Sequence, residues 1–163
     1  MIINTPVKKK DIKKLKVGDK VSIYGYIYTG RDAALPKLVK YLKNKKELFN
    51  IEGSVIMHTA VTPAGIGPTS SNKKEIEENI PYLVKKGARI HIGKGYLKKE
   101  TVDAINRYCG AFVITPPISA YLTDKIISKE VVAFPEEGME AIFKLKVEGI
   151  PGIVAVANGK SLF

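Results

Sequence analysis

The most constraining feature of this sequence is a unit that occurs three times: a run of apolar or β-branched residues, a loop containing glycine, and a helical pattern. In the first unit, a strand is predicted over residues 21–29, a loop at 30–32, and an amphipathic helix from residue 35 onward. Strands that alternate with helices are typical of α/β proteins. We therefore predict an α/β fold in which a mixed sheet is flanked by helices.

The remaining segments extend this pattern. Further strands are expected at residues 53–59, 88–92, 110–114, 126–134, 142–148 and 153–157. Helices are expected after residue 71 and over 97–108, and Pro81 has to kink or restart the first of them. Thr69, Ser70 and Ser71 precede that helix, where hydroxyl side chains commonly cap the first turn.

The length of 163 residues suits one core, and we predict a single domain over residues 1–163. Its lysine-rich residues 1–16 are expected to form a partly ordered basic arm. No apolar run approaches the roughly 20 residues that cross a bilayer, and the amino-terminal residues lack the apolar stretch of a secretory signal. We therefore expect a cytoplasmic protein without membrane contacts.

The net charge of +11 raises the alternative of nucleic-acid binding. The charge comes from 24 lysines and three arginines, Arg31, Arg89 and Arg107, against 16 acidic residues. Dispersed lysines mainly confer solubility, whereas the planar guanidinium of arginine matches a carboxylate or phosphate. Because the sequence has no helix-turn-helix, zinc-finger or RNP signature, we rank this alternative well below the one that follows and expect no nucleic-acid partner.

Three loops occupy the positions where α/β sheets bind ligands. Residues 30–32, 67–71 and 93–95 each follow a predicted strand and precede a helix. Their glycines let backbone N–H groups approach a ligand, and the loops add a cation, a hydroxyl cluster or a helix start. Together these features predict a pocket for a small anion. A P-loop is excluded, because the glycines of residues 87–94 have the wrong spacing.

Four motifs resemble those of one enzyme family and occur in its order: GRDAALPKL, GPTSS, IGKG and EEGMEAIFKLKV. They are similar to segments of the β subunit of class I fumarases and L-tartrate dehydratases, and the similarity extends from about Val17 onward. The resemblance implies a swivelling β/β/α domain of three layers. It also implies an enzyme subunit: the β subunit of a two-subunit hydro-lyase that reversibly hydrates a C4 dicarboxylate. Fumarate to L-malate is the first choice of reaction, and L-tartrate dehydration is the alternative.

The resemblance further implies that the cofactor is a 4Fe-4S cluster held by three cysteines of a partner α subunit, with no metal bound by this chain. Cys109, the single cysteine, agrees with that division, because one thiolate cannot hold a cluster. By the same analogy we expect an α2β2 heterotetramer. A homodimer of the isolated chain is left open, as is a rival function as a stand-alone carboxylate- or phosphate-binding protein.

The site residues are transferred by their position in the motifs. Arg31 and Lys94 resemble substrate-binding residues, Thr69 resembles the threonine proposed as the catalytic base, and Ser70 is expected to add a hydrogen bond to the substrate. Removing a proton next to a carboxylate builds a second negative charge, so the reaction needs cations and N–H groups fixed where that charge develops. The three loops supply both.

Two positions depart from the family pattern. Leu35 stands where family members often have histidine, and Lys73 where they often have arginine. Lys73 is still expected to bind a substrate carboxylate, but as a point charge instead of a bidentate fork. The preferred diacid therefore stays open.

Other polar residues are assigned structural roles. His58 and His91 lie within predicted strands, without partners at metal-ligand spacing, and are expected to pack in the interior. Asp32 is expected either to cap the first helix or to pair with a nearby lysine. Cys109 is expected to be a small buried apolar residue.

Overall fold

The computed structural model describes all 163 residues, and its eight strands form one sheet. In chain order the strands are β1 (Ile2–Asn4), β2 (Lys20–Thr29), β3 (Val55–Met57), β4 (Ile90–Gly93), β5 (Ala111–Ile114), β6 (Ile126–Ala133), β7 (Ile142–Ala157) and β8 (Lys160–Ser161). The helices are α1 (Lys9–Lys13), α2 (Ala34–Lys43), α3 (Lys74–Glu77), α4 (Ile80–Lys85), α5 (Lys99–Arg107), α6 (Ser119–Asp124) and the 3-10 helix η1 (Pro135–Glu140).

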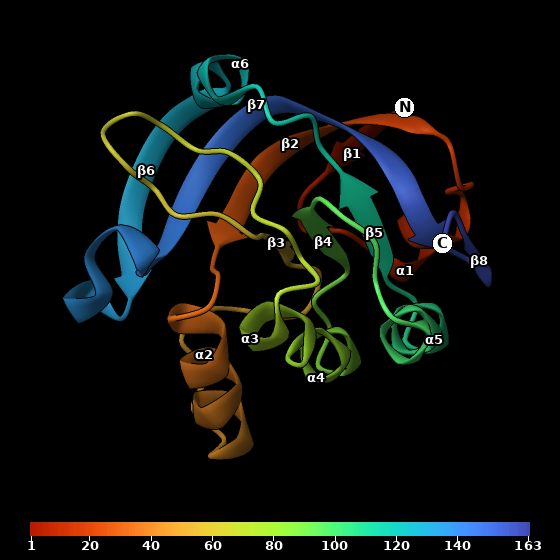
Figure 1. The fold of residues 1–163 in the computed structure, drawn as a ribbon, viewed down its shortest axis with the longest axis horizontal. Coiled ribbons are helices and arrows are strands. Elements are labelled where there is room, and N and C mark those ends of the chain that lie inside the picture. The colour runs from red at the N-terminus through yellow and green to blue at the C-terminus, as the bar shows by residue number, and fades with distance from the viewer.

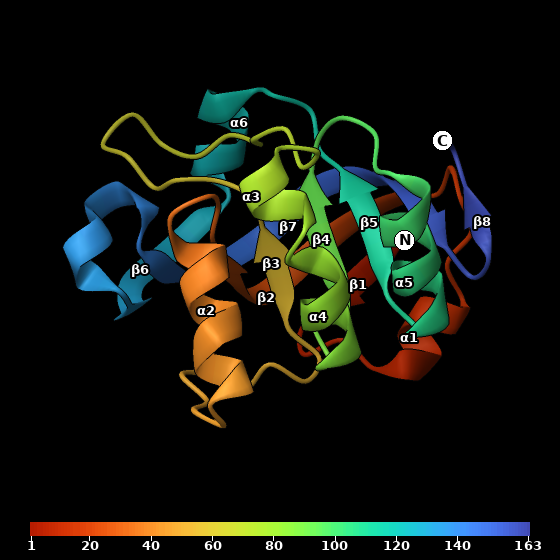
Figure 2. The ribbon, with the colours of Figure 1, turned by 60° about the horizontal axis from the view of Figure 1, so that its bottom comes forward.

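The sheet has a parallel part and an antiparallel part. Strands β1 to β5 pair in parallel in chain order, whereas β7 runs antiparallel to β2, β5, β6 and β8. Because β7 pairs with both β2 and β5, the sheet curls over itself, and an arch of β2, β7 and β6 lies above β3, β4 and β5 (Figure 1). Helices α2 to α5 cover the opposite side of the parallel strands (Figure 2). The predicted mixed α/β sheet flanked by helices is confirmed.

Successive residues of the parallel strands face different apolar cores. Val55 and Met57 of β3 belong to a cluster of 21 buried residues, in which residues from both β layers meet. Ile56 between them belongs to a second cluster of 12, which includes residues of α2, α3 and α4. Side chains alternate between the two faces of a strand, so a continuous apolar run indicates a strand that is buried on both faces.

Residues 1–16 pack into the fold and do not form the expected basic arm. Strand β1 pairs with β2, and Ile3, Val7, Ile12 and Leu15 are at most 4% exposed in the larger core. Exposed lysines separate Val7, Ile12 and Leu15, and they point to solvent while the apolar side chains face inward. The high lysine content of the segment hid this pattern.

The strands expected at 142–148 and 153–157 are one continuous strand, β7. Gly149, with a φ of 87°, is the extra residue of a β-bulge opposite the step from Ile23 to Tyr24 in β2. A bulge bends a strand and increases its twist without ending it. The glycine and proline signals near residue 150 therefore indicate a bend, which lets β7 pass from one neighbour to the next.

The helix after residue 71 is interrupted as expected. Helix α3 ends at Glu77, and α4 begins at Ile80 with Pro81 in its first turn, where a missing N–H costs nothing. The expected hydroxyl cap is wrong, because α3 begins after Lys73 and no side chain caps it. Helix α6 and the 3-10 helix η1 were not expected. In length and hydropathy, every helix falls short of what a membrane span requires.

Candidate functional site

The three predicted loops leave the sheet at one edge. Strands β2, β3 and β4 are adjacent and parallel, so their carboxyl ends lie together (Figure 2). Backbone hydrogen bonds continue the pairing past the strand ends: Gly30 N donates to Met57 O at 3.0 Å, and His58 N donates to Ile92 O at 2.8 Å. This is the edge at which α/β sheets commonly bind ligands.

Four charged side chains form a group at this edge, which we call the charged cluster: Arg31, Asp32, Lys73 and Glu140. Arg31 Nε lies 2.8 Å from Asp32 Oδ1 and 3.3 Å from Glu140 Oε1, and Lys73 Nζ lies 2.5 Å from Asp32 Oδ2. Partial burial favours the neutral acid, but hydrogen bonds from Lys73 and Arg31 outweigh it, so the pKa of Asp32 is well below its usual value. Asp32 thus pairs with a lysine, one of its two expected roles, and brings Lys73 beside Arg31.

Residues 67–71, which we call the hydroxyl loop, attach to the ends of β3 and β4. Thr69 N donates to His58 O at 2.7 Å, and Ser71 N donates to Lys94 O at 2.9 Å, which places Ser70 in a parallel bridge with Lys94. The side chains of Thr69 and Ser70 are half-buried and serve as caps for no helix. The loop therefore brings the backbone of Ser70 next to that of the predicted substrate-binding lysine.

Lys94 contributes a cation without a carboxylate partner. Its side chain is half-buried, and it takes part in none of the seven ion pairs of the chain. The next residue, Gly95, has a φ of 81°, which turns the chain sharply away from β4. An anion that enters from solvent can reach the Lys94 ammonium without displacing a neighbouring acid.

The other two arginines have structural roles away from this edge. Arg89 is 4% exposed, and its guanidinium donates to the carbonyls of Tyr108 and Cys109 and to the carboxylate of Glu52. Arg107 is exposed on α5 and stacks on Tyr108. Arg31 is therefore the one arginine that the fold brings to the ends of the parallel strands.

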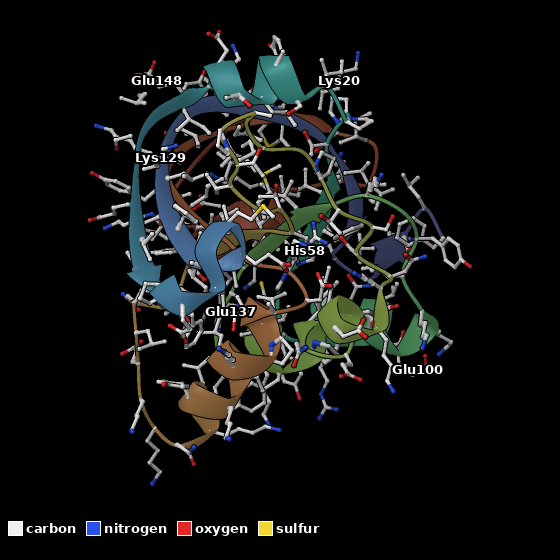
Figure 3. The ribbon with its side chains drawn as sticks, turned by 60° about the vertical axis from the view of Figure 1, so that its left-hand side comes forward. Lys20, His58, Glu100, Lys129, Glu137 and Glu148 are labelled. Atoms are coloured by element: carbon white, nitrogen blue, oxygen red, sulfur yellow. The ribbon has the colours of Figure 1, made fainter.

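A hydrogen-bonded pair of histidines, which we call the imidazole pair, contacts the hydroxyl loop through Ser71, and Figure 3 labels one of the two, His58, inside the fold. His58 Nδ1 lies 2.6 Å from Ser71 Oγ, and His58 Nε2 lies 2.9 Å from His91 Nδ1. Both rings are fully buried, as the expected packing role requires, but their hydrogen bonds to each other and to Ser71 were not foreseen. In the register of β3 and β4, His91 pairs with Ile56, so His58 lies two positions further along, directly after β3.

Burial decides the protonation of this pair. Desolvation and the neighbouring ring hold the pKa of His58 well below its usual value, and desolvation lowers the pKa of His91 to about 3. Both rings are therefore neutral at pH 7. The assignment that leaves fewest unpaired groups has Ser71 donating to His58 and His58 donating to His91, whose Nε2 has no partner.

Gly93 makes room for this arrangement. A Cβ at this position would lie 1.8 Å from Ser71 Oγ and 3.0 Å from His58 Nδ1. No side chain fits there unless the hydroxyl loop moves. The glycine before Lys94 is thus required by close packing, and its φ is not unusual.

The chain shows no place where an iron-sulfur cluster would fit. Cys109 is the only thiol, its sulfur contacts Lys9 O at 3.7 Å, and it lies at the end of α5, away from the site edge. It is half-buried instead of fully buried as expected. No three His, Cys, Asp or Glu side chains converge on a common point.

The whole chain, residues 1–163, matches the family described as Fumarase C-terminus. The chain belongs to this family. It is 35% identical to a putative L(+)-tartrate dehydratase subunit beta of Methanocaldococcus jannaschii over 95% of this chain and 87% of that protein. A putative fumarate hydratase class I of Geobacillus stearothermophilus is 32% identical, over 98% of this chain and 33% of that protein. The L(+)-tartrate dehydratase subunit beta of Escherichia coli is 27% identical, over 99% and 85%.

Membership of the fumarase C-terminal family confirms the resemblance seen in the motifs. The chain spans most of the length of the two beta subunits but only about a third of the fumarate hydratase. In this family, the same domain therefore occurs both as a separate subunit and as one part of a longer chain. This chain covers the domain that both arrangements share.

Proposed function

We propose that this chain is the β subunit of a two-chain hydro-lyase that reversibly hydrates a C4 dicarboxylate, with fumarate to L-malate as the first choice and L-tartrate dehydration as the alternative. The observation that supports it most is the meeting of Arg31, the hydroxyl loop and Lys94 at one sheet edge, in a chain that covers 87% of a relative named as a tartrate dehydratase beta subunit. Cations beside hydroxyl groups suit one end of a diacid.

Arg31 and Lys94 are proposed to bind one carboxylate of the substrate. When a proton leaves the carbon next to that carboxylate, negative charge develops on its oxygens, and cations held by the fold stabilise it without reorganising. Ser70, bridged to Lys94, is placed to donate a further hydrogen bond. Thr69 is proposed as the group that takes part in proton transfer, because it precedes Ser70 in the hydroxyl loop and its half-buried side chain caps no helix.

Lys73 is proposed to assist at the same carboxylate through Asp32. Its ammonium lies 2.5 Å from Asp32, and Asp32 in turn contacts Arg31, so the two cations share one acid. A lysine at this position can contact Asp32 and a substrate oxygen only as a flexible point charge, whereas an arginine could bind both in the fixed geometry of a planar fork. This difference from the usual family residue affects affinity more than reaction type.

We assign the 4Fe-4S cluster of the proposed enzyme to a partner α chain, because the residues of this chain do not fit a cluster. Two relatives are named as beta subunits, which implies a second subunit in those proteins. An α2β2 heterotetramer and a cytoplasmic location are proposed by the same analogy. The part proposed for this chain is binding, orientation and proton transfer at the substrate end described above.

The test is reconstitution. The chain alone is expected to be inactive, and anaerobic mixing with the α subunit of the same organism is expected to give hydration or dehydration of fumarate, L-malate, L-tartrate or a methylated analogue. In the complex, Arg31→Ala should lower kcat/KM by roughly 10²- to 10³-fold, since a contact to developing charge is lost. Arg107→Ala, which removes an exposed arginine on α5, is the matched control. A complex that is fully assembled and inactive on every diacid would contradict the proposal.

A further inference from the structure

Glu140 contacts Arg31 across the fold. It ends η1, more than 100 residues along the chain from Arg31, yet its Oε1 lies 3.3 Å from Arg31 Nε and accepts a hydrogen bond from Ala33 N at 3.4 Å. A single carboxylate oxygen therefore meets both the guanidinium and the backbone of the loop that follows β2. This acid has no role in the proposed reaction.

The two acids of the charged cluster contact Arg31 through the same nitrogen. Asp32 Oδ1 accepts from Arg31 Nε at 2.8 Å, and Glu140 Oε1 approaches that Nε as well. Neither terminal Nη group of Arg31 donates a hydrogen bond within the chain, in contrast to those of Arg89. A guanidinium has a planar fork of five N–H groups, so occupation of Nε leaves the two-nitrogen end available for a carboxylate.

The fold fixes the position of Glu140 through its neighbours. Met139 O accepts from Val61 N at 2.8 Å, which ties η1 to the loop after β3. Lys37 on α2 lies 2.5 Å from Glu137 and 3.2 Å from Glu136, and Figure 3 shows Glu137 close to the start of that helix. Glu140 is thus held by contacts on both sides and not by its own side-chain preference.

The charges of the cluster balance. Two cations, Arg31 and Lys73, face two acids, Asp32 and Glu140, so the group is formally neutral. Lys94 then supplies the uncompensated positive charge that attracts a dianion. Glu140 consequently weakens the general attraction of Arg31 for anions. What it can contribute to the site is the orientation of the Arg31 guanidinium.

We propose that Glu140 is a positioning residue: together with Asp32 it holds the Nε side of Arg31, so that the two Nη groups point toward a carboxylate of the substrate. The identity of that ligand rests on the proposed function, whereas the orientation of Arg31 is a property of this chain alone. The two parts of the inference are therefore tested separately.

The orientation is tested by nitrogen-15 NMR of the full chain, because three arginines give three Nε–H signals and Arg31→Lys assigns one of them. Glu140→Ala is expected to speed the exchange of the Arg31 Nε–H with water at least roughly threefold, because the second acid beside this N–H is lost and water can reach it, although Asp32 still accepts its hydrogen bond. Glu136→Ala removes the same charge from the same helix without contact to Arg31, and should leave the signal unchanged. An unchanged Arg31 signal in Glu140→Ala would overturn the proposal.

Glu140→Gln keeps an acceptor oxygen and removes the charge, so it should retain slow exchange of the Arg31 Nε–H. It serves as the conservative variant if Glu140→Ala does not fold. In the reconstituted enzyme, Glu140→Ala should lower kcat roughly three- to tenfold without raising KM, because attraction of the dianion increases while orientation is lost. A rise in KM at constant kcat would refute the positioning role. If the wild-type complex were inactive, the proposed function would fail while the NMR result still decided the orientation of Arg31.

Discussion

The charged cluster and the imidazole pair lie near the same edge of the sheet but differ in solvent exposure and in charge. Arg31, Asp32 and Glu140 are 25 to 29% exposed, so their ion pairs are screened and can exchange partners at little cost. His58 and His91 are fully buried and neutral, and their hydrogen bonds cannot be replaced by water. The groups proposed to face a ligand are partly exposed to solvent, whereas the groups that hold the hydroxyl loop in place are buried.

The largest expected effect concerns Thr69, which joins the two regions, since its N–H bonds to His58 O while its hydroxyl is proposed to face the substrate. In the reconstituted enzyme, Thr69→Val should lower kcat by roughly 10²- to 10⁴-fold, because a group in proton transfer is lost while size and backbone bonding are kept. Thr69→Ser, which retains the hydroxyl, should recover most of the rate. A fall of less than tenfold in Thr69→Val would leave Thr69 as a binding group only.

One added methyl group should disrupt the packing around the imidazole pair. Gly93→Ala should destabilise the protein by about 2–4 kcal/mol in urea unfolding, because its Cβ would overlap Ser71 Oγ. Gly67→Ala is the matched control in the hydroxyl loop, since its Cβ would meet nothing closer than 3.9 Å. Combining Gly93→Ala with Ser71→Ala should restore part of the stability, and a double variant as unstable as Gly93→Ala would argue against the overlap as the cause.

Acid should loosen the imidazole pair before it affects the charged cluster. The folded-state pKa values of both histidines lie below the usual 6.5, so the unfolded chain binds more protons as pH falls through 6.5, and stability present above that pH is lost. When the pH falls from 7 to 6, the two histidines should lower the free energy of unfolding by about 1.4 kcal/mol. Asp32, whose pKa is lowered, should lose its contribution only below its usual value of 3.8. Histidine ring signals that titrate near pH 6.5 in the folded protein would contradict this order.

The smallest effect is expected at Lys73 in the charged cluster. Lys73→Arg should raise kcat/KM of the reconstituted enzyme by roughly three- to fivefold, because a planar fork can hold Asp32 and a substrate oxygen together. Lys74→Arg, one residue further along and without an acid partner, serves as control. A fall of more than tenfold would show that the compact ammonium of Lys73 is itself required at the site.

Local patterns predicted most of the fold, and long-range pairing explains where they failed. Strand β2, helix α2 and the restart at Pro81 follow from periodicity and backbone chemistry, which a sequence displays directly. The continuity of β7 depends on a bulge against β2, more than 100 residues away in the chain, and no local signal separates a bulge glycine from a turn glycine.

The candidate site divides in the same way. Arg31, Thr69 and Lys94 could be proposed from motifs: Arg31 and Lys94 follow closely after strands, and Thr69 lies in the long loop between β3 and α3. Glu140 and the histidine hydrogen bonds could not. The contact of Glu140 with Arg31 arises only when η1 folds back to the loop after β2, and the histidine bond arises only when β3 and β4 pair. Motif spacing thus gives the residues that face a ligand, and the folded chain gives those that hold them.

Strand β7 has a mechanical consequence. One strand of 16 residues hydrogen-bonds to β2, β5, β6 and β8, and thereby locks the curved upper layer to the flat lower one. Neither layer can tilt against the other without breaking the backbone hydrogen bonds that β7 makes to both. If the molecule rotated against a second polypeptide, Arg31, the hydroxyl loop and Lys94 would therefore move together as one rigid body.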